Sequence, residues 1–225
     1  MIPAVPLCID LLFVFVVVLT IGIAYAAVRS RVFLIAAVVW VLAQSALGYC
    51  GFYQDTTQLP PRILLFGVLP CVLLLVGCVL TPRGRSWMDT MVLRTLTWLH
   101  TIRIPVEIVL WLLVERKLLS ESMSVGGTNF DILSGLSAPV IAILAFRSGR
   151  IDRRLLLVWN IVCTLLLFNV VITAALAIPS PLQQHSFDQP NAALLYFPYN
   201  LLPAVVVPLV LFAHVVAFRR LLRAK

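Results

Sequence analysis

Charged residues are scarce in this sequence. Asp, Glu, Lys and Arg make up only 12% of its 225 residues, whereas 62% are hydrophobic and the mean hydropathy is +1.06. A soluble domain has about 25% charged and about 45–50% apolar residues. The basic residues stand in short clusters between apolar runs, which is typical of membrane orientation and not of a nucleic-acid surface. The composition therefore predicts a polytopic membrane protein that has the lipid bilayer, and no nucleic acid, as its partner.

Sequence motifs of several enzyme classes are also missing. The chain has no P-loop, no G-x-S-x-G and no H-E-x-x-H. Its five cysteines lack the spacing of metal ligands, so we expect no metal site. Cys8 and Cys50 should both lie toward the outer side of the membrane, where a disulfide is chemically possible. Whether the protein is an enzyme is not decided by its motifs.

Seven apolar stretches approach the length of about 20 residues that spans a bilayer. They fall roughly at residues 5–28, 32–54, 62–81, 93–115, 131–147, 154–178 and 194–218, and the fifth is the shortest. No long polar segment and no internal repeat interrupts them. We therefore expect an all-α fold in which residues 1–225 form a single membrane-embedded domain, a bundle of seven transmembrane helices.

Basic residues alternate between the connections of this bundle. The side that holds the loops after the first, third and fifth helices and the C-terminal tail has most of them: Arg29, Arg31, Arg83, Arg85, Arg94, Arg147, Arg150, Arg153, Arg154, Arg219, Arg220, Arg223 and Lys225. Arg62, Arg116 and Lys117 lie on the other side. Basic loops stay in the cytoplasm, so we expect the N-terminus outside and the C-terminus inside, in the cytoplasmic (inner) membrane if the source is bacterial.

This expected topology resembles that of the rhodopsins. A retinal Schiff base needs a lysine amine inside the bundle. The only lysines, Lys117 and Lys225, lie outside the predicted helices. The resemblance therefore ends at topology, and retinal is excluded as a chromophore.

One predicted helix carries three ionisable residues on one face. Between residues 96 and 117, offsets of three and seven place His100, Arg103 and Glu107 on the same side of a helix. Ionisable groups at bilayer depth are unfavourable without partners, so this face should look into the bundle and mark a site. Pro105 removes one backbone donor beside the charges and allows a kink there.

Two interpretations of Arg103 and Glu107 are open, because the residues are four apart. They form an intrahelical ion pair with a structural role, or they build a functional site. In either case the remaining guanidinium donors need acceptors, for which Gln44, Asn160, Asn169 or a ligand anion are candidates.

Depth along the predicted helices groups the other polar residues around this pair. The ligand-binding residues that we expect are Arg103, Glu107, Asp10, Gln44, Asp131, Asn169 and Asn200. Arg103 falls near the middle of the membrane and the others in its outer half, which predicts a polar cavity that opens to the outside. Thr128, Asn129 or Asp131 is alternatively a simple N-cap of the fifth helix.

Two histidines fall in the inner half, on different helices. His100 and His214 have the chemistry to ligate a b-type haem or to join a proton relay. A single histidine per helix near the interface is more often only a hydrogen-bonded residue. We therefore expect no cofactor, and we assign His100 together with Glu107 to a proton relay.

The last predicted helix contains Pro203 and Pro208. Each proline deprives the carbonyl four residues earlier of its helical partner, so a neighbour, water or solute has to satisfy that carbonyl. Interrupted helices of this kind line binding sites in many transporters, although prolines are also common in inert membrane helices.

Three functional hypotheses follow from these features. The first is a small transporter or solute-binding protein for a small polar or amphipathic ligand, which Arg103 holds while Glu107 pairs with Arg103 or takes up a proton. The second is a membrane-embedded enzyme for a lipid-like substrate, with Glu107 or Asp131 as general acid/base and His100 as a second proton carrier. The third is an accessory subunit whose intramembrane charges meet a partner helix. A lateral opening between helices, without a continuous polar path, would favour the second hypothesis, the membrane-embedded enzyme.

Overall fold

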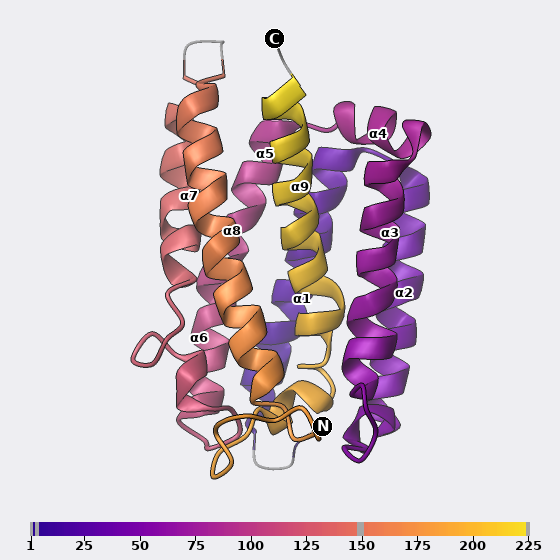
Figure 1. Cartoon of the computed structure of the whole chain (residues 1–225), viewed down its shortest axis with the longest axis vertical. Coiled ribbons are helices and arrows are strands. Elements are labelled where there is room, and N and C mark those ends of the chain that lie inside the picture. Colours follow the sequence, from indigo (N-terminus) through magenta and orange to yellow (C-terminus); the bar gives the residue numbers. More distant parts are fainter. Residues whose placement is uncertain (1, 3–4, 148–150, 224–225) are drawn as a thin grey trace.

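The chain folds into an upright helical bundle. The computed structural model describes residues 2, 5–147 and 151–223, and these ranges contain no strand. The beginning of α1 (Leu7–Val28) and the end of α9 (Val207–Arg223) lie at opposite ends of the bundle (Figure 1). The fold is compatible with a helical membrane protein.

Six helical stretches within the described ranges are long and apolar enough to cross a membrane. They are Leu7–Val28, Arg31–Tyr49, Ile63–Leu80, Leu93–Val114, Arg153–Leu176 and Leu202–Arg223. The first two are α1 and α2, and Arg153–Leu176 is α8. The third joins a π-helical turn, Ile63–Val68, to α3 (Leu69–Leu80), and the last joins the π-helical turn Leu202–Val206 to α9.

The expected seventh span is a shorter helix. The apolar segment at 131–147 contains α7 (Ile132–Leu144), whose 13 residues extend for about 20 Å, less than the roughly 30 Å of a hydrocarbon core. In Figure 1 α7 begins partway along the bundle. The described chain therefore contains six full-length candidate spans and one shorter apolar helix, instead of seven full-length spans.

The connection between α6 (Arg103–Val114) and α7 packs into the bundle. It includes the 3-10 turn Glu121–Met123, and its residues Leu119, Met123 and Asn129 are at most 2% exposed. Backbone groups buried in this way need internal partners. Asn191 provides one of them, because its Oδ1 accepts from the backbone N–H of Ser120 at 2.9 Å.

Prolines interrupt two spans, as the sequence predicts. The turn before Pro105 tightens into a 3-10 turn, His100–Ile102, between α5 (Leu93–Leu99) and α6. The carbonyl of Ala204, four residues before Pro208, accepts a hydrogen bond from Trp40 Nε1 at 2.8 Å. A side chain of α2 thus satisfies the acceptor that the proline leaves without a helical partner.

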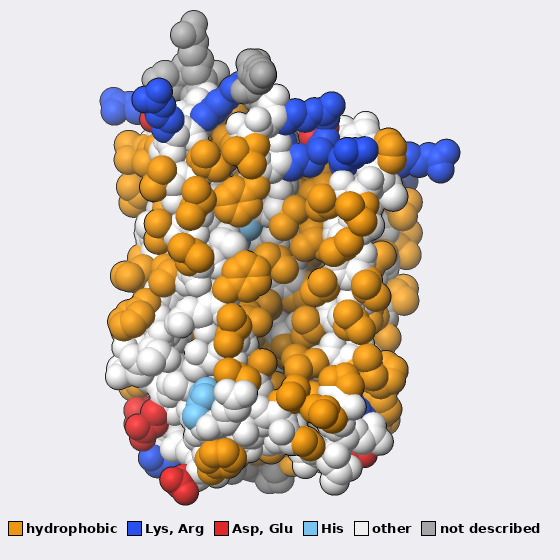
Figure 2. Space-filling model, in the orientation of Figure 1, with side chains coloured by type: hydrophobic (Ala, Val, Ile, Leu, Met, Phe, Trp, Pro, Cys, Tyr) orange, Lys and Arg blue, Asp and Glu red, His pale blue; other side chains and the backbone are white. Residues whose placement is uncertain are grey.

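An additional short helix, α4 (Pro82–Asp89), lies at the end of the bundle where α9 ends (Figure 1). The Thr81 hydroxyl caps it by accepting from Gly84 N at 3.1 Å, and Pro82 occupies its first turn, where a missing N–H leaves no helical bond unmade. Figure 2 shows Lys and Arg side chains concentrated at this same end. Arg150 and Lys225, which we expected on this side, and most of the loop at 147–150 lie outside the described residues.

The outer faces of α2 and α3 are rich in exposed apolar side chains. Leu73, Leu74 and Leu80 are 60%, 70% and 71% exposed, which is unfavourable in water and normal against lipid. Cys8 and Cys50 are exposed and are not joined in a disulfide.

Candidate functional site

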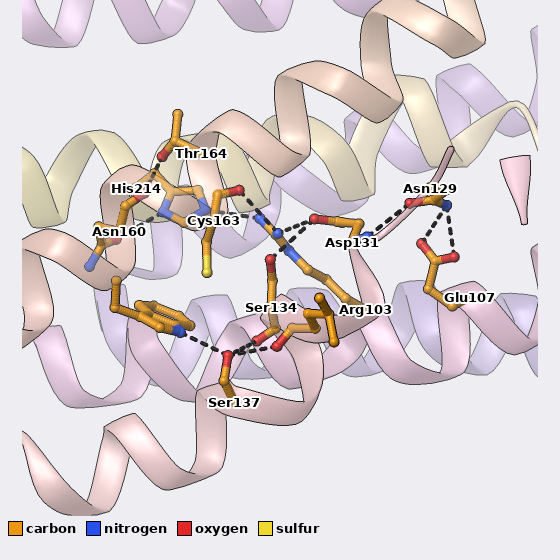
Figure 3. A network of polar contacts seen from close by, with 12 residues as sticks. Arg103, Glu107, Asn129, Asp131, Ser134, Ser137, Asn160, Cys163, Thr164 and His214 are labelled. Atoms are coloured by element: carbon orange, nitrogen blue, oxygen red, sulfur yellow. Dashed lines mark hydrogen bonds and ion pairs between the residues drawn. The ribbon is translucent and has the colours of Figure 1, made fainter. Parts of the chain in front are cut away.

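Arg103, the first residue of α6, lies at the centre of a buried polar cluster that joins four helices (Figure 3). Its side chain is 3% exposed and forms an ion pair through Nη1 with Asp131, the residue before α7. Nη1 also donates to the Cys163 carbonyl of α8 at 3.4 Å, and Nη2 donates to His214 Nε2 of α9 at 2.9 Å. His100, Arg103 and Glu107 are all at most 5% exposed, so their face does look into the bundle.

The intrahelical ion pair between Arg103 and Glu107, one of the two interpretations that the sequence leaves open, is not formed. Asp131 takes the guanidinium, although it is 28 residues away in sequence. The two oxygens of Glu107 instead accept from Asn129 Nδ2 at 2.9 and 2.7 Å. The spacing of four residues permits an ion pair but does not impose one, because the folded-back connection brings a second carboxylate to Arg103.

Asn129 links the two acidic residues. Its Nδ2 binds Glu107, while its Oδ1 accepts from the backbone N–H of Asp131 at 3.0 Å. Asp131 occupies the N-cap position of α7, yet its carboxylate accepts no capping bond from the α7 backbone. It accepts from Arg103 and, at 3.3 Å, from the Ser134 hydroxyl. The simple N-cap interpretation of Asp131 is therefore wrong.

The hydrogen bonds of His214 determine its tautomer. A guanidinium only donates, so His214 Nε2 accepts from Arg103 and carries no proton. The proton is on Nδ1, which donates to Asn160 Oδ1 at 2.8 Å. Asn160 Nδ2 in turn donates to the Leu156 carbonyl at 2.7 Å. His214 is thus a neutral, doubly hydrogen-bonded connector between α6 and α8.

The ring of His100 lies close to that of His214 in a tilted arrangement and is nearly perpendicular to that of Trp159. The ring centroids of the two histidines are 4.2 Å apart at 32°, and those of His100 and Trp159 are 5.2 Å apart. Imidazoles this close leave no room for a haem between them. His100 Nδ1 is buried without a hydrogen-bond partner in the described chain, and no hydrogen bond joins His100 to Glu107 there, so the relay remains a hypothesis.

An apolar cavity of about 100 Å³ reaches two of these acidic residues. Val68, together with Val171 and Ala175 of α8, lines it, and Glu107 and Asp131 contribute the acidic side chains to its wall. The cavity is lined by residues of α8 and of the Ile63–Val68 turn, among others. It differs from the polar, outward-open cavity that we expected.

The other expected ligand-binding residues lie in separate groups. Asp10 accepts from the Tyr199 hydroxyl at 2.6 Å. Asn200 Nδ2 donates to the Gln44 carbonyl at 2.8 Å, and Asn169 is exposed on α8, where it donates to the Thr128 carbonyl at 2.8 Å. None of these four residues lines the apolar cavity.

Sequence reasoning missed the roles of Asn129 and His214 in this cluster. The signal for Asn129 was present as two polar residues, Asn129 and Asp131, that flank Phe130 before an apolar run, but it also fits a helix cap. Within residues 2, 5–147 and 151–223, no group of three or more His, Cys, Asp or Glu side chains has a geometry that could hold a metal ion.

The apolar helices and the buried ionic cluster fit the class of multi-pass helical membrane proteins. Residues 60–222 match the family described as a domain of unknown function (DUF8737), and the chain belongs to this family. The matched region includes the complete Arg103 cluster and begins after α2. No curated protein and no solved structure matches the chain.

Proposed function

We propose that this protein binds a lipid-like, amphipathic molecule that enters sideways from the bilayer, with Glu107 as the acceptor for its polar group. The observation that carries this proposal is the pair of acidic residues, Glu107 and Asp131, in the wall of an otherwise apolar cavity. Ligand sites combine mostly apolar walls with a few polar groups that fix orientation.

The cavity size supports a ligand that extends into the membrane. An apolar cavity of about 150 Å³ holds a molecule of the size of benzene. A cavity of about 100 Å³ therefore encloses only a short alkyl segment beside the polar group, and the rest of an acyl chain has to lie outside. Val68, Val171 and Ala175 in its wall are themselves only partly buried, which suits entry from the lipid side.

The acceptor capacity of Glu107 favours a hydrogen-bond donor on the ligand. An ionised carboxylate accepts about four hydrogen bonds, and in the described chain Glu107 accepts only from the single amide nitrogen of Asn129. A hydroxyl or an amine on the ligand would supply further donors. Asp131 is already engaged by Arg103, so we assign recognition to Glu107.

A polar-solute transporter has less support than a lipid-binding protein. The residues expected to line one polar path fall into separate groups, and the cavity wall is mostly apolar. The lipid-like ligand of the enzyme hypothesis fits the same cavity, but the proposed second proton carrier, His100, has no hydrogen bond to Glu107 in the described chain. Binding, without an assigned reaction, is therefore the function that we propose.

The test is lipid retention by variants in which a carboxyl group is replaced by an amide of nearly the same size. In mild detergent, native mass spectrometry of the wild-type protein should detect a bound lipid-sized mass. Glu107→Gln keeps the side-chain size and one acceptor for Asn129. It should reduce the fraction of protein that carries the bound lipid about tenfold. Asp10→Asn changes a buried carboxyl group outside the cavity and should leave the fraction of lipid-bound protein unchanged. Equal retention in both variants, or equal loss, contradicts the proposal.

A steric pair of variants tests the cavity independently of charge. Ala175→Phe fills the wall position on α8 and should displace the ligand. Ile172→Phe, at a position of α8 that is 55% exposed and does not line the cavity, is its control. Retention in Ala175→Phe would place the ligand elsewhere.

We further propose that the chain crosses the membrane seven times with its N-terminus outside, α7 and the packed connection before it making up the fifth crossing. The concentration of basic residues at the opposite end of the bundle supports this orientation. Thr57 and Ser86 are both exposed, in connections at opposite ends of Ile63–Leu80. In intact cells, a membrane-impermeant maleimide should label Thr57→Cys more strongly than the wild-type protein, whose native cysteines give the background signal. Ser86→Cys should be labelled no more than the wild type. The reverse pattern would mean that the topology is inverted.

A further inference from the structure

A second pocket lies at the basic end of the bundle, between α4 and α9. Its volume is about 400 Å³, and it is lined by Pro82, Arg85, Ser86, Asp89, Arg219 and Arg223. It lies at the end of the bundle opposite to the beginning of α1 (Figure 1) and shares no residue with the apolar cavity. Any ligand of this pocket is therefore distinct from the one proposed above.

Asp89 holds two of the arginines in place. Its Oδ2 accepts from Arg219 Nη2 at 2.6 Å and from Arg223 Nη1 at 2.7 Å. Arg219 Nε also donates to the Arg85 carbonyl at 3.2 Å, which ties α9 to α4. The hydrogen bond from Arg219, with the positive charges of Arg219, Arg223 and Arg220, keeps the pKa of Asp89 below its usual value. Asp89 therefore stays ionised and acts as a positioning residue.

The pocket keeps an excess of positive charge and of unused donors. Three arginines and one aspartate give its lining a formal charge of +2. The Arg85 guanidinium has no partner in the part of the chain that the structure describes, and Asp89 engages only one terminal nitrogen each of Arg219 and Arg223. Guanidinium groups bind phosphate oxygens in pairs of parallel hydrogen bonds, so this lining suits a phosphate group.

The position of α4 at the membrane boundary points to a phosphate carried by a lipid. Trp87 of α4 packs against Phe33 and Phe212, with ring centroids 6.5 and 5.7 Å apart, and aromatic side chains of this kind mark the interface. Figure 2 shows apolar side chains directly below the basic side chains of this end, and Leu80, which ends α3 two residues before α4, is 71% exposed. An acyl chain that follows this surface would leave its headgroup beside the arginines.

We propose that the pocket between α4 and α9 binds the phosphate headgroup of an anionic membrane phospholipid, with Arg85, Arg219 and Arg223 as the ligating residues. Basic pockets between helices at the cytoplasmic surface are suited to such headgroups. The site gives these arginines a specific ligand in addition to their effect on topology.

The experiment compares variants that lose the same charge at different places. The full-length protein is reconstituted in phosphatidylcholine nanodiscs that contain a small fraction of phosphatidylglycerol, and the phosphatidylglycerol retained after detergent extraction is measured by native mass spectrometry. Arg219→Gln/Arg223→Gln should lower retention about tenfold or more. Arg31→Gln/Arg94→Gln removes two exposed arginines outside the pocket and should change it less than about twofold. Equal losses would mean a diffuse basic surface and would overturn the proposal.

Two further arms separate binding from folding and from free phosphate. Arg85→Gln breaks no side-chain hydrogen bond or ion pair of the described chain, so the variant should fold normally and still lose phosphatidylglycerol; normal retention would overturn the proposal. Inorganic phosphate at millimolar concentration should not displace the lipid, because it lacks the acyl chains. Displacement would show that the pocket takes phosphate from solution and would overturn the lipid assignment.

Discussion

The partner choice of Arg103 can be tested by two double-mutant cycles. One cycle combines Arg103→Gln with Asp131→Asn, and the other combines it with Glu107→Gln. The first removes both members of the observed ion pair. The second removes the two residues that spacing alone would pair, and both carboxylates are replaced by amides of nearly the same size.

The expected coupling energies differ several-fold. Removing one member of a buried ion pair leaves an uncompensated charge and costs about 3–5 kcal/mol, so each single substitution at Arg103 or Asp131 should be severely destabilising. The double variant removes both charges, so it should be much less destabilised than the sum of the two single substitutions. This difference corresponds to a coupling energy of about 2–4 kcal/mol. Exposed helical neighbours four residues apart couple by about 0.2–0.5 kcal/mol, and Arg103 and Glu107 form no direct bond, so their coupling should stay well below that of Arg103 and Asp131.

Equilibrium unfolding in mixed micelles of mild detergent and dodecyl sulfate gives the four free energies of each cycle. Sites that share no partner should be additive within about 0.5 kcal/mol. A coupling with Glu107 that equals or exceeds the coupling with Asp131 would refute the assignment of Asp131 as the counter-ion. It would favour the intrahelical pair instead.

Two other substitutions probe the packing of α7 and the pocket at α4. A Cβ at Gly135 would lie 3.0 Å from the backbone N of Ile104, so Gly135→Ala should lower the free energy of unfolding by about 1–3 kcal/mol. A Cβ at Gly77 has nothing within 4 Å, so Gly77→Ala should cause no such loss. Equal melting temperatures of the two variants would contradict this prediction. The pKa of Asp89 is lowered in the folded state by its arginine partners, so its stabilisation is complete above the unfolded value of about 3.9 and is lost as the pH falls through the lower folded value. The melting-temperature difference between wild type and Asp89→Asn should therefore be constant from about pH 5 to 8 and shrink below about pH 4, and a difference that persists at pH 2 would contradict it.

The sequence predicts those features that follow from one segment at a time. Apolar length predicts seven spans, and six of these stretches are helices long and apolar enough to cross a membrane in the described chain. Helical spacing predicts that His100, Arg103 and Glu107 share a buried face. The missing N–H of Pro208 predicts an acceptor in need of a partner, which the structure places at the carbonyl of Ala204. Each of these arguments uses only local geometry and the chemistry of the bilayer.

Features that depend on how segments meet are not accessible in this way. Asp131 reaches Arg103 because residues 115–131 fold back into the bundle, and no local pattern distinguishes this path from an exposed loop with a helix cap. The amphipathic helix α4 did carry a signal, Thr81 followed by Pro82, but eight residues among basic ones are easily taken for a loop. The identity of the partner helix for His214 likewise depends on tertiary packing.

Asn129 connects the proposed lipid cavity to the helix cluster through one side chain. Its Nδ2 donates to Glu107, its Oδ1 accepts from the backbone N–H of Asp131, and the Asp131 carboxylate pairs with Arg103. A ligand group that donates to Glu107 would use the acceptor sites that Asn129 leaves free on the same carboxylate. Asn129 cannot turn away without leaving the N–H of Asp131 unpaired, which costs about 1–3 kcal/mol in a buried site. Because Asp131 immediately precedes α7, we expect that a ligand in the proposed site would be coupled to the start of α7 through this amide.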